Sequence, residues 1–169
     1  LEDRVTVLLK DYRKLTGTYD RLVSIEMIEA IGHENYQDFF SKCSELLAED
    51  GAMLLQAITI RDQFYESARD SVDFIKRYIF PGCNIPSVGA LHEAMIAVSD
   101  LGLSHMEDIG PHYARTLAEW RRNLLSNQRE VVGLGFDQHF LRLWEFYLAY
   151  CEGGFAERQL GDAQMLLTK

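Results

Sequence analysis

Two glutamates follow a short, mostly apolar run at residues 22–25, the end of a predicted strand, where an α/β sheet usually holds its reactive groups. The run ends in Ile25, and Glu26 and Glu29 come next, before a glycine and a new helical pattern. Ligands of such sheets bind at the carboxyl ends of the strands. A carboxylate there can act as a general base if it lies about 2.6–3.2 Å from the proton it takes. The spacing therefore indicates acid–base chemistry at this strand end.

Other common catalytic motifs are incomplete. His92 and Glu93 begin an H-E-x-x-H pattern, but Ile96 stands where the second histidine should be, which excludes a zinc-protease helix. The three cysteines are widely spaced and odd in number, which favours neither a zinc site nor a disulfide framework and suits a reducing cytoplasm. No serine lies in a G-x-S-x-G nucleophile turn. We therefore expect neither a metal site nor a serine nucleophile.

A stripe of aromatic residues runs along a predicted helix near the C-terminus. Its members step by four, four, three and four residues and are Phe136, Phe140, Trp144, Tyr147 and Cys151. Such spacing places side chains on one helix face, which is usually buried in the core. The stripe ends on a cysteine, however, and ring faces attract cations. A role in the core and a role in a binding site both remain open.

Strand and helix patterns alternate along the chain, as in an α/β sheet. We predict strands over 4–12, 19–25, 51–60, 103–110 and 157–169, and helices within 35–47, 61–80, 85–102, 114–126 and 136–151. No G-x-G-x-x-G phosphate turn is present, and the G-x-G at 133–135 fits a helix end better than a phosphate cradle. The order predicts a mostly parallel sheet flanked by helices.

Composition limits the class of protein. The 169 residues are 47% hydrophobic, which is enough for one core and predicts a single domain. The net charge of −9 repels nucleic acid, so we expect no nucleic-acid partner. No apolar run reaches the roughly 18 residues of a membrane span. We therefore expect a cytoplasmic protein that, at most, touches a membrane surface.

Five segments, in order, resemble the cyclopropane-fatty-acyl-phospholipid synthase family, whose members use S-adenosylmethionine to modify unsaturated lipid acyl chains. The segments are DYR (11–13), YDRLVSIEMIEAIG (19–32), KRYIFPGCNIPS (76–87), IGPHYARTLAEWRRN (109–123) and LRLWEFYLAYCEGGF (141–155). The resemblance implies a class I methyltransferase fold, which is a Rossmann-like sheet with flanking helices. It also implies that residues 1–169 are the C-terminal part of one methyltransferase domain, with the first strands and the glycine-rich cofactor turn missing.

The resemblance assigns roles to four residues. Glu29 matches the family glutamate, Tyr113 the tyrosine before T-L-x-x-W, and Cys151 the cysteine of the aromatic helix, and these hold a bicarbonate base in the family. Gln56, in L-L-Q-A-I, replaces the histidine of L-L-H-T-I and can donate a hydrogen bond but carry no charge. Bicarbonate is therefore a candidate second cofactor. Glu26 receives no role and is interpreted as a cofactor-side or loop carboxylate.

The resemblance also implies an S-adenosylmethionine site. Asp11 and Tyr12, near the end of the first predicted strand, and Ile25, at the end of the second, match positions that contact the adenosine part of the cofactor. The carboxylate of Asp11 could accept from the adenine amino group or the ribose hydroxyls. Taken alone, Asp11 would be interpreted as an ordinary turn residue.

The implied reaction is transfer of a one-carbon unit to the double bond of an unsaturated acyl chain in a phospholipid, giving a cyclopropane or a methyl- or methylene-branched chain. The implied partners are unsaturated phospholipid acyl chains and, peripherally, the membrane surface. Two alternatives remain: an inactive fragment that is structural, binds lipid or self-associates, and a small-molecule methyltransferase of the same fold. Missing strands would leave the edge of strand 19–25 unpaired, which predicts a homodimer through that edge or disorder of residues 1–18.

Overall fold

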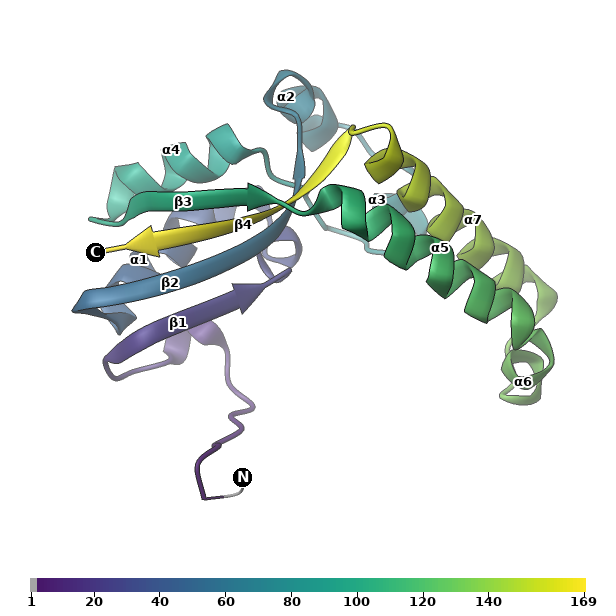
Figure 1. Cartoon of the computed structure of the whole chain (residues 1–169), viewed down its shortest axis with the longest axis horizontal. Coiled ribbons are helices and arrows are strands. Elements are labelled where there is room, and N and C mark those ends of the chain that lie inside the picture. Colours follow the sequence, from purple (N-terminus) through teal and green to yellow (C-terminus); the bar gives the residue numbers. More distant parts are fainter. Residues whose placement is uncertain (1–2) are drawn as a thin grey trace.

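A computed structural model describes residues 3–169, which form a mixed four-stranded sheet with a helical arm at one end (Figure 1). The strands are β1 Tyr19–Ile25, β2 Leu47–Ile60, β3 Gly102–Asp108 and β4 Leu160–Thr168. The α-helices are α1 Tyr36–Leu46, α2 Asp62–Asp70, α3 Phe74–Tyr78, α4 Val88–Val98, α5 Gly110–Ser126, α6 Gln128–Gly133 and α7 Gln138–Ala156. Short 3-10 helices span Tyr12–Lys14, Ile28–Ala30 and His33–Asn35.

The strand order β1-β2-β4-β3 places the last strand of the chain inside the sheet. β1 pairs with β2 in parallel, whereas β4 pairs antiparallel with both β2 and β3. β1, β2 and β3 therefore run in one direction and β4 runs against them. The predicted α/β class is confirmed, and within the described chain the sheet is mixed. The carboxyl ends of β1, β2 and β3 and the amino end of β4 consequently meet at one edge.

The main core lies between β2 and the helices α1 and α4. In β2, buried residues alternate with half-buried ones, and Met53, Leu55 and Ala57 are fully buried. The helix predicted within 35–47 is confirmed as α1, and the apolar residues that recur at helical spacing after Asn35 are all buried: Tyr36, Phe39, Phe40, Cys43, Leu46 and, at the start of β2, Leu47. Because its alternate residues are buried in this core, β2 is held in place, and with it the polar residue Gln56 near its carboxyl end.

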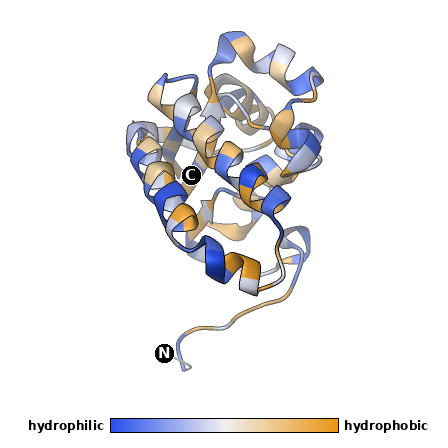
Figure 2. Ribbon diagram, turned by 90° about the vertical axis from the view of Figure 1, so that its right-hand side faces the viewer, coloured by the Kyte–Doolittle hydropathy of each residue, from blue (hydrophilic) through white to orange (hydrophobic). Residues whose placement is uncertain are grey.

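The helical arm consists of α5 and α7, which lie side by side and extend away from the sheet (Figure 1). Figure 2 views the molecule from the side of the arm and shows hydrophobic and hydrophilic residues alternating along the helices. The buried residues of α7 are Leu141, Leu148 and Phe155, with Leu117 of α5 against the last two. No helix in the described part of the chain is long and apolar enough to cross a membrane.

The aromatic stripe does not form the core of the arm. Phe136 is exposed, while Phe140, Trp144 and Tyr147 are only half-buried. Their rings contact one another in sequence, with centroids 4.3, 5.7 and 5.3 Å apart. The core interpretation holds only at the end of this stripe, where Tyr147 and Cys151 pack against the buried cluster of the arm. The rest of the stripe lies outside that cluster, because α7 packs on α5 through its other face. The aromatic face is left free to line other surfaces.

The predicted strand over 4–12 is wrong. Residues 4–10 are exposed and belong to no strand, and a 3-10 helix begins at Tyr12. An alternating pattern forms a strand only where a neighbouring strand supplies hydrogen-bond partners, and the described chain places none beside this segment. Residues 1–2, which belong to the segment predicted to be disordered, lie outside the described residues. Pairing of the free edge of β1 with a second copy stays a prediction.

The start of α7 is held by a side-chain cap, which gives a testable contribution to stability. The carboxylate of Asp137 accepts a hydrogen bond from the backbone N–H of Phe140 at 2.8 Å. Asp137→Ala is expected to lower the free energy of unfolding by about 1 kcal/mol, because one helix-end N–H loses its acceptor. Urea unfolding of the full-length protein measures this. Asp137→Asn keeps an acceptor, and an equal loss in that control would contradict a capping role.

Candidate active site

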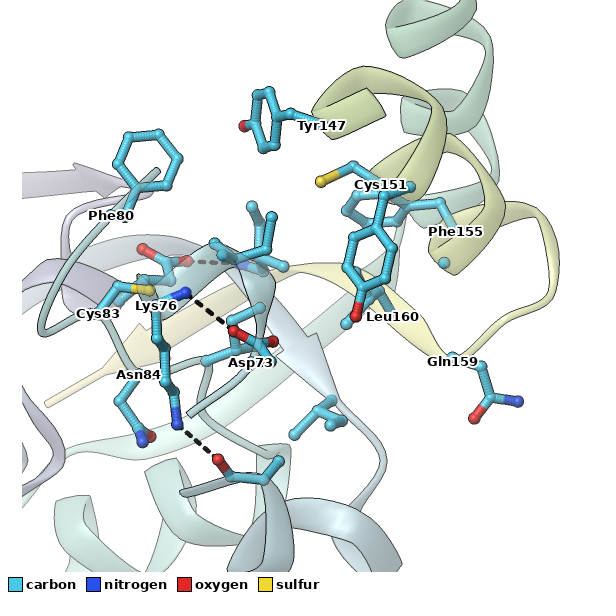
Figure 3. Close-up of a pocket in the computed structure, with 18 of the residues that line it drawn as sticks. Asp73, Lys76, Phe80, Cys83, Asn84, Tyr147, Cys151, Phe155, Gln159 and Leu160 are labelled. Carbon is cyan, nitrogen blue, oxygen red and sulfur yellow. Dashed lines mark hydrogen bonds between the residues drawn. The ribbon is translucent and has the colours of Figure 1, made fainter. Parts of the chain in front are cut away.

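A cavity of about 840 Å³ lies where the arm meets the carboxyl ends of β1 and β2. Most of its lining is apolar, and its polar residues come from separate elements. Figure 3 shows Tyr147, Cys151 and Phe155 of α7 on one side, and Phe80 and Cys83 of the segment after α3 on the other. The arm therefore forms one wall of the cavity, and the segment between α3 and α4 forms the other.

Glu26 lines this cavity and has a hydrogen-bond donor on each oxygen of its carboxylate. Its Oε2 accepts from the hydroxyl of Tyr113 on α5 at 2.9 Å, and its Oε1 accepts from Nε2 of Gln56 on β2 at 2.9 Å. The backbone N–H of Glu26 also donates to the carbonyl of Gln56 at 2.9 Å. Both oxygens of the carboxylate are thus held by donors from two different elements.

The amide of Gln56 is fixed in one orientation by a second glutamine. Gln164 of β4 donates from Nε2 to Oε1 of Gln56 at 2.9 Å. Nε2 of Gln56 must therefore point the other way, and it donates to Oδ2 of Asp162 at 3.1 Å as well as to Glu26. A neutral amide thereby joins two carboxylates.

Glu29 lies in a different environment from Glu26. Its Oε1 accepts from the backbone N–H of Ile58 at 2.6 Å, and its buried Oε2 has no hydrogen-bond partner among the described residues. Burial raises the pKa of Glu29 to about 7, and the nearby charges of Glu26 and Asp162 add to the shift. Glu29 can therefore gain or lose a proton near neutral pH.

Asp162 is a buried carboxylate that the sequence interpretation missed. Its side chain is fully buried, and Oδ1 has no partner within the described part of the chain. Burial, followed by the charges of Glu26 and Asp108, raises its pKa to about 6. The available signal was Asp162, the one charged residue of the strand Leu160–Thr168. Asp162 reaches the site because β4 runs antiparallel to β2, which places the amino end of β4 beside the carboxyl end of β2.

Tyr113 is positioned from behind by an aromatic ring. The ring of Phe155 stacks on it with centroids 4.7 Å apart and planes 14° from parallel. Burial and the hydrogen bond to Glu26 raise the pKa of the Tyr113 hydroxyl, so it stays protonated and donates. Nearby, burial raises the pKa of Tyr147 to about 12 and that of Cys151 to about 11. The thiol is therefore neutral at physiological pH.

A family model described as mycolic acid cyclopropane synthetase matches residues 1–165 of the chain. The chain belongs to this family. Its members are S-adenosylmethionine-dependent lipid methyltransferases and cyclopropane synthases. The resemblance inferred from the five sequence segments is thereby confirmed.

Individual relatives agree with this assignment. Tuberculostearic acid methyltransferase UfaA1 of Mycobacterium tuberculosis is 37% identical over 98% of this chain and 39% of its own length. Cyclopropane-fatty-acyl-phospholipid synthase of Escherichia coli is 29% identical, over 98% of this chain and 41% of its own length. The chain therefore spans about two fifths of these curated relatives.

The solved structures confirm the predicted class I methyltransferase fold. Mycolic acid cyclopropane synthase CmaA1, complexed with SAH and CTAB, superposes with a TM-score of 0.85 at 29% sequence identity. The match covers 96% of this chain and 59% of that one.

The structure brings most of the family-derived site residues together, with one change of partner. Glu29, Tyr113 and Cys151 line the cavity, and Gln56 is hydrogen-bonded to Glu26 on its wall. The sequence predicts that Tyr113 and Glu29 both bind one anion. No hydrogen bond among the described residues joins these two side chains. Tyr113 donates to Glu26 instead, so a loop carboxylate without an assigned role occupies the centre of the network.

The three residues predicted to hold the adenosine part of the cofactor lie apart from this cavity. Asp11 forms an ion pair with Arg13, with Oδ2 and the guanidinium 2.7 Å apart, and that bond lowers the pKa of Asp11 to about 2. The ring of Tyr12 packs against Phe39 at 5.8 Å. Ile25, at the end of β1, is 59% exposed. None of Asp11, Tyr12 and Ile25 is among the described residues that line the cavity.

Within residues 3–169, no group of three or more His, Cys, Asp or Glu side chains is arranged to hold a metal ion.

The buried Asp162 makes a prediction for the pH dependence of stability. Because its folded-state pKa is raised from 3.8 to about 6, the folded state binds more protons than the unfolded state between those values. Its contribution to stability is therefore lost as pH rises through that range. Asp162→Asn is expected to raise the free energy of unfolding by about 2 kcal/mol at pH 7.5 and to change it little at pH 3.5. Urea unfolding at both pH values measures this, and an equal effect at both would contradict it.

Proposed function

We propose that the full-length protein containing this chain transfers a one-carbon unit from S-adenosylmethionine to the double bond of an unsaturated acyl chain in a phospholipid. The observation that carries the proposal is the apolar cavity with carboxylates at its wall. Its size and lining suit a hydrocarbon chain. Glu29 and Tyr113 lie in this lining, so acid–base groups are next to the place where the chain would lie.

The residues of this chain fit one side of a cofactor site. S-adenosylmethionine, when bound, supplies an electrophilic methyl group. The carboxylate of Asp11, oriented by Arg13, is an acceptor that could hold ribose or adenine donors. The exposed side chain of Ile25 offers apolar surface at the carboxyl end of β1, where ligands of such sheets bind. We propose that Asp11, Tyr12 and Ile25 hold the adenosine part.

The cavity can stabilise the positive charge that the reaction creates on the substrate. An alkene is a weak nucleophile, and its attack on a methyl group leaves a carbocation on the acyl chain. The rings of Phe80 and Tyr147 line the cavity and meet edge to face at 6.0 Å. Each ring face attracts a cation by roughly 0.5–2 kcal/mol. The apolar lining also excludes water that would otherwise trap the cation.

The carbocation must then lose a proton, and we propose Glu29 as the base. Its pKa of about 7 is close to the value that favours a general base at neutral pH. Loss of a proton from the new methyl group closes a cyclopropane. If a hydride first shifts so that the cation lies on the methyl-bearing carbon, loss of a proton from the same methyl group gives a methylene branch. A methyl branch requires a reductant in addition. A bicarbonate ion bound by Tyr113 is the family-based alternative to a protein carboxylate, with Cys151 as a further neutral contact.

The substrate and the free strand edge suggest the partners. Phospholipid acyl chains lie in a membrane, so we propose that the protein is cytoplasmic and contacts the membrane peripherally. Tyr19, Val23 and Ile25 are exposed on β1, whose outer edge is unpaired within the described chain. We propose that this edge pairs with another strand of the full-length protein or with a second copy.

Mass spectrometry of lipids from cells that express the full-length gene tests the reaction. We expect unsaturated acyl chains to gain one carbon that carries the label of isotopically labelled methionine. Glu29→Gln should abolish the product, whereas Glu49→Gln, at an exposed carboxylate near the other end of β2, should not. If the protein is made and no acyl chain is modified, the lipid proposal is wrong, and labelled small molecules would then support the alternative methyltransferase.

A further inference from the structure

The backbone of Glu26 adopts a conformation that favours glycine. Its φ is +49°, in the left-handed region. For a residue with a Cβ this conformation costs roughly 1–2 kcal/mol relative to the right-handed one, and such strain is often found at functional sites. Favourable contacts of the Glu26 side chain are therefore needed to offset this cost.

Those contacts make Glu26 a fixed anion. The hydroxyl of Tyr113 and the amide of Gln56 each donate to a different oxygen of its carboxylate at 2.9 Å. Gln56 cannot turn its amide over, because Gln164 occupies its Oε1. The donors are thus in place before any ligand binds. Hydrogen bonds that end on a carboxylate are charge-assisted and stronger than those between neutral groups.

Glu26 and Glu29 therefore occupy contrasting environments on the wall of one cavity. Glu26 has a donor on each oxygen, whereas Oε2 of Glu29 is buried without a partner among the described residues. Two carboxylates in unlike surroundings commonly divide their roles, one staying charged and the other exchanging a proton. The same division fits these two residues.

We propose that Glu26 is the built-in anion of this cavity: it faces the positive charge formed on the acyl chain and makes a recruited small anion unnecessary, while Glu29 takes the proton. This inference rests on the proposed function. In the step itself, the alkene π electrons form a bond to the methyl carbon as its bond to sulfur breaks. The electrons of a C–H bond of the added methyl group then form the carbon–carbon bond to the cationic carbon, which closes the ring, and the proton passes to the Glu29 carboxylate.

The position of Glu26 explains the partner of Tyr113. A tyrosine hydroxyl that points into an apolar cavity needs a hydrogen-bond acceptor. Here the acceptor is the carboxylate of Glu26, a residue of the chain itself. Fixed charges aimed at a developing charge stabilise it without reorganisation, and removal of one such group commonly costs about 100- to 1,000-fold in rate. We expect a loss of that size when the carboxylate of Glu26 is removed.

Two variants of the full-length protein test this role. Glu26→Gln keeps the shape and removes the charge, and Glu26→Gly removes the side chain at a backbone position that suits glycine. Both are expected to lose at least about 100-fold in the rate of acyl-chain modification, with thermal melting close to that of the wild type. Formate or bicarbonate should restore activity to Glu26→Gly by filling the space beside Tyr113. The wild type should be insensitive to bicarbonate. Glu49→Gln is the matched control.

The pH–rate profile gives a readout that a structural role would not move. The wild-type rate should rise with pH as Glu29 loses its proton, around pH 7. Burial is the main cause of that raised pKa, and the charges of Glu26 and Asp162 add to it. In Glu26→Gln the rising limb should therefore move to lower pH, although burial and the charge of Asp162 still hold the pKa of Glu29 above the ordinary glutamate value.

The outcomes separate the two proposals. An active wild type with an active Glu26→Gln variant would overturn the role of Glu26 and leave the proposed function standing. Loss of wild-type activity after removal of bicarbonate would do the same, because a recruited anion would then be needed. If the variants lose activity, but anions do not rescue Glu26→Gly and the residual activity of Glu26→Gln shows the wild-type pH dependence, Glu26 has a structural role. That result would also overturn the inference. A wild type that modifies no acyl chain would overturn both proposals.

Discussion

Glu29→Gln is expected to raise the free energy of unfolding by about 2–3 kcal/mol at pH 8 and to abolish acyl-chain modification. Glu29 has a pKa of about 7 in the folded state against 4.5 as its ordinary value. The folded state therefore binds more protons between these values, and stability falls as pH rises from about 4.5 to about 7. Above pH 7 the full cost of the buried charge remains. A neutral amide of the same shape removes that cost.

Urea unfolding of the full-length protein at pH 8 and pH 4.5 measures this effect. The gain should be present at pH 8 and nearly absent at pH 4.5, where Glu29 is protonated in the folded state. Glu49→Gln, at an exposed carboxylate, should change stability little at either pH. A gain in stability together with a loss of activity is common at functional sites. Destabilisation of Glu29→Gln at pH 8 would contradict the assigned environment of this carboxylate.

Phe155→Ala is expected to lower the free energy of unfolding by about 3–5 kcal/mol, the range for loss of a buried phenylalanine ring. Phe155 is 3% exposed and packs with Leu117 and Leu148 where the arm joins the sheet. Its ring also stacks on Tyr113 at 4.7 Å. The substitution should therefore loosen the arm and release Tyr113 from its position beside Glu26.

Urea unfolding and activity of the same variant separate these two effects. Phe155→Leu keeps most of the buried volume and should recover more than half of the lost stability, while activity stays low because no ring remains to stack on Tyr113. A loss below about 1 kcal/mol in Phe155→Ala would mean that the site can collapse around the gap. Full activity in Phe155→Leu would show that the stacked ring does not position the tyrosine.

Local patterns predicted most of the elements. The apolar stripe after Asn35 and the strand at 19–25 are found as α1 and β1, and the strand predicted at 51–60 lies within β2. These succeed because a face buried against one core imposes a period of 3.6 or 2 residues on the sequence. The aromatic stripe of α7 has the same helical period yet is largely outside the core. Periodicity identifies a shared face but not what that face contacts.

The strand prediction at 4–12 failed for a related reason. Its alternation of apolar and polar residues is a property of the segment, whereas strand formation requires a partner. The described chain offers no strand next to it, and residues 4–10 remain exposed. By contrast, the prediction for 157–169 succeeded, because β4 finds partners on both sides.

The sequence by itself determined the family, the helix and strand periods, and the presence of Glu29, Tyr113 and Cys151 at motif positions. Only the tertiary structure decided which carboxylate Tyr113 meets and that Asp162 joins the site. Tyr113 lies 87 residues from Glu26, and Asp162 lies 106 residues from Gln56. Such contacts depend on the order of strands in the sheet and on the left-handed backbone of Glu26. No local spacing records either feature, because both arise only when distant segments pack against one another.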